Sequence, residues 1–324
     1  MNKLRIMNWN VRGLNSLASR DAVCENAQTA RATILCLQET KMATITDRQG
    51  REIGGNRLNN FSFLSAIGTS GGIALFWDDS EIDATNITEK TYSISANITL
   101  KDKGASFLLT TVYGPSRDNE KLEFLQEMAS LPPPVQTPWI ILGDFNLIYE
   151  ARDKNNLNLN RSLMGQFRAA LNRNGLKEIR LQNRKYTWGN EREQATVVKL
   201  DRVFCNCQGD FLFTNFLLQA MSTSFSDHCP LLLLNADRPR RKAHFNFENF
   251  WIKLSGFLEQ VTETWERETG SLNPVRLSKK LSNTTLALRK WRRTKLGGLE
   301  NGVPHGVGIN PKVRPSAGAA ILIK

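Results

Sequence analysis

The sequence predicts an α/β domain in which two stacked β-sheets are flanked by helices, followed by a basic helical extension. Through residues 1–235, short apolar runs alternate with polar connectors, and the runs suited to strands outnumber those suited to helices. Residues 93–100 carry apolar side chains at every second position, as expected of a strand with one buried face. Many strands with few intervening helices favour two stacked sheets over a doubly wound parallel sheet.

The expected elements follow from hydrophobic periodicity and from residues that end helices. Strands are expected at 4–10, 34–37, 61–64, 73–77, 93–100, 106–113, 139–142, 186–188, 197–204 and 230–234. Helices are expected at 21–31, 119–131 and 162–174. Leu122, Leu125 and Met128 lie on one side of the second of these helices, and Gly175 ends the third.

Residues beyond 235 differ in character from the rest. The segments 247–268 and 275–296 place Leu and Trp side chains at helical spacing, which predicts two amphipathic helices. Residues 236–296 are therefore expected to form a basic helical linker segment after an enzyme-sized domain at 1–235. Residues 297–324 are rich in Gly and Pro, so little fixed structure is expected there.

The composition, with 40% hydrophobic and 23% charged residues, is that of an ordinary globular protein and excludes a wholly disordered chain. No apolar run approaches the roughly 20 residues that span a bilayer, and the first residues contain no basic-then-apolar signal region. A membrane protein or a secreted protein is therefore not expected. The five cysteines include no C-x-x-C pair, which argues against a structural zinc site.

The net charge of +12 is unevenly distributed along the chain. Residues 1–235 contain 26 Lys and Arg against 24 Asp and Glu, whereas residues 236–324 contain 17 against 7. A segment this basic indicates a polyanionic partner, although a solvated basic face has the same composition.

Acidic and polar side chains cluster where four predicted strands end: Asn8 and Asn10, Gln38 and Glu39, Asp144 and Asn146, and Asp227 and His228. Together they supply what phosphodiester hydrolysis needs, namely carboxylate oxygens for a hard cation, a base for water, and donors for charge on phosphorus. Each cluster alone is weak evidence, since Gly-Asp-x-Asn is as often a turn as a site. Asp201, on a nearby predicted strand, is suited to orient or charge the imidazole of His228.

The order of six motifs in this chain resembles that of the endonuclease/exonuclease/phosphatase superfamily across residues 4–234. The motifs are Trp9-Asn10-Val-Arg-Gly-Leu14, Leu37-Gln-Glu39-Thr-Lys41, Val112-Tyr113-Gly-Pro115, Gly143-Asp144-Phe-Asn146, Leu200-Asp201-Arg-Val203 and Ser226-Asp227-His228. The chain particularly resembles the apurinic-type endonuclease domain of LINE-type (non-LTR) retrotransposons, above all those of plants. That narrower resemblance is carried by Gly71-Gly-Ile-Ala-Leu-Phe-Trp77, Tyr186-Thr-Trp188 and His244-Phe-Asn-Phe-Glu-Asn-Phe-Trp251.

The resemblance implies a four-layer αββα sandwich of two mixed sheets, with one active-site pocket at the top of the sheets. It implies that Glu39 is the main ligand of Mg²⁺, for which Mn²⁺ is a possible substitute, and that Asp227 and Asn10 assist it. DNA is the partner that the resemblance implies.

The resemblance also implies roles for side chains around the phosphate. Asp144 takes the proton of the attacking water or holds that water in line, and His228, paired with Asp201, stabilises charge on phosphorus. Asn146 and Tyr113, with Asn10, orient the phosphate oxygens. Arg12 and Trp188 are expected to contact substrate, although an aromatic residue at a strand end is as often part of a core.

Two positions bear on the branch of the superfamily. Arg12 stands where many repair members have a carboxylate, which puts abasic-site repair in doubt more than DNA nicking. Tyr113 stands where DNase-like and phosphatase-like members more often have His, which favours the apurinic-like branch.

The leading hypothesis is a nuclear, Mg²⁺-dependent endonuclease that nicks target DNA and leaves a 3′-hydroxyl primer end and a 5′-phosphate. The alternatives are a phosphatase or phosphodiesterase of the same superfamily acting on a small phosphorylated substrate, and a catalytically silent nucleic-acid-binding remnant. No reverse transcriptase domain is expected. Phe76-Trp-Asp-Asp79 matches a reverse transcriptase string, but it ends an internal strand, and the 89 residues after Asn235 are too few for a polymerase palm.

Overall fold

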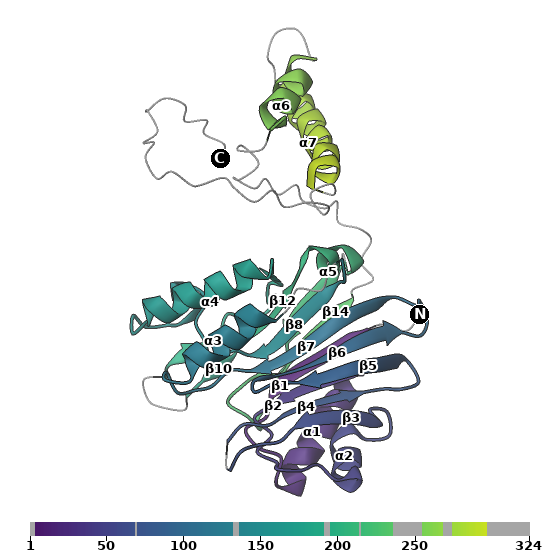
Figure 1. Cartoon of the computed structure of the whole chain (residues 1–324), viewed down its shortest axis with the longest axis vertical. Coiled ribbons are helices and arrows are strands. Elements are labelled where there is room, and N and C mark those ends of the chain that lie inside the picture. Colours follow the sequence, from purple (N-terminus) through teal and green to yellow (C-terminus); the bar gives the residue numbers. More distant parts are fainter. Residues whose placement is uncertain are drawn as a thin grey trace. The chain divides into compact units, whose positions relative to one another are not determined.

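The computed structural model describes residues 4–68, 70–131, 136–190, 195–213, 215–235, 255–267 and 274–296. The chain divides into two compact units, Met1–Pro239 and Arg240–Lys324. The first unit contains the β-sheets, and the second contains two helices (Figure 1).

The first sheet has six strands in the order β13-β14-β1-β2-β4-β3. Its strands are β1 (Arg5–Asn10), β2 (Ile34–Gln38), β3 (Asn60–Leu64), β4 (Ile73–Trp77), β13 (Phe216–Ala220) and β14 (Leu231–Asn235). β1 and β2 are parallel, whereas the other neighbours are antiparallel, so the sheet is mixed.

The second sheet also has six strands, in the order β5-β6-β7-β8-β12-β9. Its strands are β5 (Ile82–Glu89), β6 (Ser93–Leu100), β7 (Ser106–Tyr113), β8 (Trp139–Asp144), β9 (Lys177–Glu178) and β12 (Asp201–Cys205). Only β7 and β8 are parallel among the described neighbours of this sheet. Two short strands, β10 (Trp188–Gly189) and β11 (Val197–Val198), pair separately.

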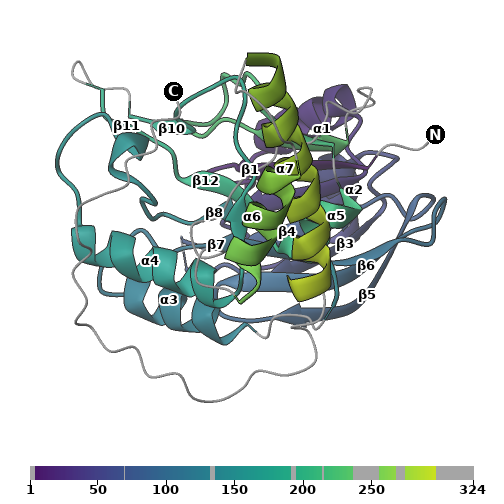
Figure 2. The same cartoon turned by 90° about the horizontal axis from the view of Figure 1, so that it is seen from above.

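The two sheets stack face to face and helices cover their outer faces (Figures 1 and 2). Helices α1 (Leu17–Ala30) and α2 (Asp47–Gly54) pack on the first sheet, and α3 (Lys121–Ser130) and α4 (Arg161–Arg173) pack on the second. The core between the sheets contains inward-facing residues of both, including Ile6, Ile34, Leu109 and Ile140. The predicted αββα sandwich is confirmed.

The sheet topology corrects the prediction that all four polar clusters follow strands. Asp227 and His228 precede β14, and β14 runs antiparallel to β1, so its first residues lie beside the last residues of β1. Asp201 likewise begins β12 and pairs in register with Asp144 at the end of β8. Antiparallel pairing therefore brings strand beginnings and strand ends to the same edge.

Some elements were not predicted, notably α2, β5, β13 and the short helix α5 (Cys207–Leu212). Most side chains of β5 are exposed or half-buried, so its hydrophobic alternation is weak. The single strand predicted at 197–204 is divided, because residues 199 and 200 leave the ladder. The N–H of Lys199 donates to the carbonyl of Asp153 at 2.8 Å, and the N–H of Leu200 donates to Thr187 Oγ1 at 3.0 Å.

The second unit contains α6 (Phe257–Glu266) and α7 (Pro274–Leu296), which pack through Phe257, Val261, Leu288 and Trp291. The predicted helix at 275–296 is confirmed, and the one predicted at 247–268 is found from 257 onward. Residues 247–254 and 297–324 lie outside the described residues. Within the described ranges, no helix is long and apolar enough to cross a membrane.

Candidate active site

The predicted catalytic residues converge where the two sheets meet at one edge. Asn10 ends β1 of the first sheet and Asp144 ends β8 of the second. The Asn10 side-chain amide donates to Asp144 Oδ2 at 2.8 Å, which joins the two sheets directly. Both side chains are buried, Asp144 completely. The edge of the sandwich therefore presents a carboxylate fixed from both sheets.

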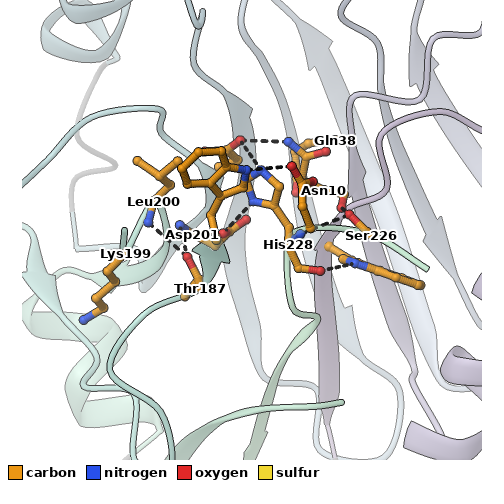
Figure 3. Close-up of polar contacts among 12 residues, drawn as sticks. Asn10, Gln38, Thr187, Lys199, Leu200, Asp201, Ser226 and His228 are labelled. Carbon is orange, nitrogen blue, oxygen red and sulfur yellow. Dashed lines mark hydrogen bonds and ion pairs between the residues drawn. The ribbon is translucent and has the colours of Figure 1, made fainter. Parts of the chain in front are cut away.

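His228 lies between two buried carboxylates (Figure 3). Its Nδ1 is 2.9 Å from Asp201 Oδ2, and its Nε2 is 3.8 Å from Asp144 Oδ2. The His228 carbonyl accepts from Trp9 Nε1 at 3.0 Å, and its N–H donates to Ser226 Oγ at 3.2 Å. The contact with Asp201 holds the proton on Nδ1, so Nε2 faces Asp144.

Burial displaces the pKa values of this group. It raises the pKa of Asp144 to about 7, because a carboxylate removed from water is costly to ionise. Burial alone would lower the pKa of His228, but the carboxylates of Asp201 and Asp144 outweigh it and raise that pKa to about 9. At neutral pH the imidazole is therefore charged, and the raised pKa of Asp144 is a displacement typical of catalytic sites.

Asn146 and Tyr113 complete the surroundings of Asp144. The backbone N–H of Asn146 donates to Asp144 Oδ1 at 2.9 Å, and its side-chain amide donates to the carbonyl of Gly114 at 2.8 Å. Burial, reinforced by the negative charges of Glu39 and Asp144, raises the pKa of Tyr113 well above its usual range. The phenol therefore stays protonated and can act as a donor.

The backbone around the site is unusual at several candidate positions. Arg12, Glu39 and Asn146 have positive φ angles of 54°, 54° and 48°. Non-glycine residues seldom adopt this region, and such residues concentrate at functional sites. Gly143, with φ of 149°, precedes Asp144, and a Cβ there would lie 1.9 Å from the carbonyl oxygen of Val112. Only glycine allows β8 to approach β7 this closely just before the Asp144 carboxylate.

Two acidic side chains at the mouth of the site each face a cation. Asp227 Oδ2 accepts from Arg12 Nη1 at 2.9 Å and from Trp188 Nε1 at 2.8 Å. Glu39 Oε1 is 2.9 Å from Lys41 Nζ. The Arg12 side chain remains 58% exposed, so its guanidinium is fixed by Asp227 and is still accessible to a substrate.

Residues 7–228 match the Endonuclease/Exonuclease/phosphatase family. This segment is more than half of the chain and contains every candidate residue described above. The chain belongs to this family. The superfamily expected from the six motifs is thereby confirmed.

Several known proteins are similar to this member of the Endonuclease/Exonuclease/phosphatase family. The "Transposon TX1 uncharacterized 149 kDa protein" of Xenopus laevis is 23% identical over 209 residues, which cover 60% of this chain. The aligned segment spans only 15% of the length of that relative.

Among solved structures, the AP endonuclease LMAP from Leishmania major superimposes with a TM-score of 0.58 at 15% identity, covering 73% of this chain and 88% of that one. The endonuclease domain of TRAS1, a telomere-specific non-LTR retrotransposon, superimposes with a TM-score of 0.53 at 15% identity, covering 73% and 100%. At these identities the structural similarities establish a shared fold.

The residues present fit the divalent cation on which the Endonuclease/Exonuclease/phosphatase family depends. Asp201 Oδ1 and Asp227 Oδ1 are buried acceptors for which the described residues provide no hydrogen-bond donor. Among the described residues, Asp144, Asp201 and His228 also place one ligand atom each within 4.8 Å of one another. This group overlaps the predicted catalytic residues, whereas the predicted metal ligands are Glu39, Asn10 and Asp227. Carboxylate and amide oxygens are the donors that a hard cation takes.

The hydrogen bonds of a buried polar layer beneath the site were not predicted, although Asn8, Gln38 and Ser226 belong to the predicted polar clusters and motifs. Gln38, fully buried at the end of β2, donates through Nε2 to Asn8 Oδ1 at 2.8 Å and to Thr111 Oγ1 at 3.0 Å. Ser226 Oγ donates to the carbonyl of Asn10 at 2.9 Å. The residue that could have revealed this layer is Gln38. It is polar, yet it lies on the face of its strand that points into the core, where an apolar residue is expected.

Proposed function

We propose that this protein is an Mg²⁺-dependent DNA endonuclease that nicks target DNA and leaves a 3′-hydroxyl primer end. The observation that carries the proposal is His228 held between Asp201 and Asp144 at the meeting edge of the two sheets. Membership in the Endonuclease/Exonuclease/phosphatase family supports hydrolysis of a phosphate ester. The likeness to a transposon protein and to the TRAS1 endonuclease domain favours DNA as substrate, and hence action in the nucleus.

In the proposed reaction, Asp144 accepts the proton of the attacking water, for which a pKa near 7 is suited. Asn10 and Asn146 hold its carboxylate in place. His228 donates a hydrogen bond to the phosphate as negative charge accumulates, and Asp201 keeps the imidazole charged. Tyr113 donates to the same phosphate from the end of β7.

Glu39, Asn10 and Asp227 would hold Mg²⁺, or Mn²⁺ as a substitute. When bound, the cation neutralises charge on the phosphate and on the leaving oxygen. Arg12 adds a fixed positive charge at the mouth of the site, where Asp227 orients its guanidinium. Trp188 contacts the same carboxylate, which places its indole beside the expected path of the substrate.

The proposal is tested by incubating supercoiled plasmid with the protein in Mg²⁺ and, in parallel, in EDTA. Nicking is expected only with the metal, and a DNA polymerase should extend the nicks directly. Ends that need a phosphatase before extension would contradict the primer-generating role. Hydrolysis of a small phosphate ester without nicking would support the phosphatase alternative, and a folded protein with neither activity would support the silent remnant.

Arg12 leads to a prediction about substrate preference. Activity on a duplex containing one abasic site is expected to remain within about threefold of activity on an intact duplex. The reason is that a guanidinium paired with Asp227 occupies the position at which repair members place a carboxylate. Side-by-side initial rates on matched oligonucleotides measure this. An abasic preference of a hundredfold would show that Arg12 has no such effect.

The basic second unit leads to a prediction about DNA binding. Helix α7 contains eight Lys and Arg residues and no Asp or Glu. Deleting 236–324 should weaken binding to a random duplex much more than it slows single-turnover cleavage, because all candidate catalytic residues precede 235. Each phosphate contact contributes about −0.9 to the slope of log affinity against log salt concentration. The slope of the truncated protein should therefore be shallower by the contribution of roughly two to four contacts.

The matched control keeps the chain at full length and replaces Arg289, Lys290, Arg292 and Arg293 with Gln. It should reproduce a large part of the change in slope if α7 provides the contacts. An unchanged slope in both variants would mean that the charge of this unit faces solvent or another partner.

A further inference from the structure

Thr187 lies next to the catalytic group and has no part in the function proposed above. It is 2% exposed and immediately precedes Trp188. Its Oγ1 accepts from two successive backbone N–H groups, those of Leu200 and Asp201, at 3.0 Å each (Figure 3). The Thr187 side chain therefore fixes the backbone of Leu200 and Asp201, and with it the position of the Asp201 carboxylate.

The backbone of Thr187 contacts the other half of the catalytic pair. Its carbonyl accepts from the N–H of Cys229 at 2.9 Å, directly after His228, and its own N–H donates to the carbonyl of Val198 at 3.0 Å. The next residue, Trp188, forms an isolated antiparallel bridge with His228. One residue thus bonds to the segment that carries Asp201 and to the segment that carries His228.

The segment around Asp201 needs this support. Between β11 and β12, residues 199 and 200 leave the ladder, so the regular pairing of β12 with β8 begins only at Asp201. Asp201 is 1% exposed, and water is therefore no substitute partner for its N–H. Without the threonine oxygen, two adjacent N–H groups at the start of β12 would lose their acceptor.

We propose that Thr187 is the positioning residue of the Asp201–His228 pair, and that its hydroxyl oxygen sets the distance at which the imidazole is held. Only the expected change in kcat rests on the proposed function. The expected change in the Asp201–His228 hydrogen bond does not, and it can be measured without substrate. The hydroxyl oxygen fixes the backbone at Asp201, and the carbonyl of Thr187 fixes the backbone next to His228.

Thr187→Val keeps the shape of the side chain and removes the acceptor. We expect kcat for nicking to fall roughly 10- to 100-fold with KM changed less than threefold, because a small displacement of a catalytic group slows the chemical step. Thr187→Ser keeps the oxygen and should stay within about threefold of the wild-type kcat. The control is Thr33→Val. Thr33 is also 2% exposed, and its Oγ1 accepts the backbone N–H of Arg5 at 3.0 Å at the start of β1 in the first sheet, the opposite end of that strand from Asn10.

The second readout is the NMR signal of the proton on His228 Nδ1 in the full-length protein without metal or DNA. The chain has three histidines, so comparison with His228→Gln assigns the signal. A downfield signal is expected in the wild type, in Thr187→Ser and in Thr33→Val, and its loss is expected in Thr187→Val. If Thr187→Val does not fold, Thr187→Cys replaces it, because Cys and Ser differ only in one atom and sulfur is a weak acceptor.

Each outcome separates the two proposals. If the wild type does not nick DNA, the proposed function fails, while the NMR comparison still decides the role of Thr187. A kcat of Thr187→Val within threefold of wild type, or a His228 signal retained in Thr187→Val, overturns the inference. Equal losses in Thr187→Ser and Thr187→Val also overturn it, because Thr187→Ser keeps the oxygen, and the oxygen would then not be what holds the pair in place.

Discussion

Asp144→Asn is expected to lower the rate of plasmid nicking by roughly 10³-fold while the protein stays folded. The substitution keeps the size of the side chain and removes the proposed base, a contribution of about 10² to 10⁴ in rate. It also removes one of the carboxylates that raise the pKa of His228. Glu39→Ala, which removes the proposed main metal ligand, is expected to have an effect of similar size.

The measurement is single-turnover nicking across a titration of Mg²⁺, with thermal unfolding recorded for each variant. Asp102→Asn is the matched control, since it makes the same chemical change at an exposed turn remote from the site. A rate for Asp144→Asn within about tenfold of wild type, at saturating metal, would remove Asp144 from its assigned role. The same criterion applies to Glu39.

Arg202→Met is expected to destabilise the first unit by about 3–5 kcal/mol, the cost of removing one partner from a buried ion pair. Arg202 is fully buried and adjoins Asp201. Its guanidinium lies 2.6 Å from Asp153 Oδ2 and 2.6 Å from Glu178 Oε1, and it stacks over the ring of Tyr149 at 5.6 Å. Without it, Asp153 would keep a buried charge for which the described ranges provide no other cation at this distance.

The change in urea midpoint at constant m-value measures this effect. Arg152→Met is the control, because Arg152 is 70% exposed and pairs with Glu150 at the surface, where an ion pair contributes about 1 kcal/mol or less. A destabilisation by Arg202→Met no larger than that of the control would contradict the importance of the buried pair.

The Arg202 effect should also depend on pH. Burial alone would raise the pKa of Glu178, but the charges of Arg202 and Lys199 outweigh it and hold the pKa below its ordinary value. Stability from this carboxylate is therefore present above its unfolded-state pKa and is lost as the pH falls through the lower folded-state pKa. The difference between Arg202→Met and wild type should accordingly shrink in acid.

The family, the sandwich and most of the candidate site were predictable from the sequence. Candidate residues such as Asn10, Asp144 and His228 are recognised by motifs that are local in the sequence, and the order of those motifs along the chain is specific. Strand periodicity is also local, which is why β6 was predicted with its observed bounds. By contrast, β5 is largely exposed, so its sequence lacks the regular alternation of apolar and polar residues by which a strand is recognised.

The amino-acid sequence by itself determined which side chains are the candidates for the chemistry and in what order they occur. Only the tertiary structure decided how they meet. Antiparallel pairing placed His228 and Asp201 at strand beginnings beside strand ends. The return of the chain at residue 187 gave the backbone N–H of Asp201 its acceptor, Thr187 Oγ1. The pairing of Arg12 with Asp227 joins residues 215 positions apart. Hydrogen bonds and ion pairs depend on separation in space, and these two residues come within 3 Å because β14 pairs antiparallel with β1, which places the start of one strand beside the end of the other.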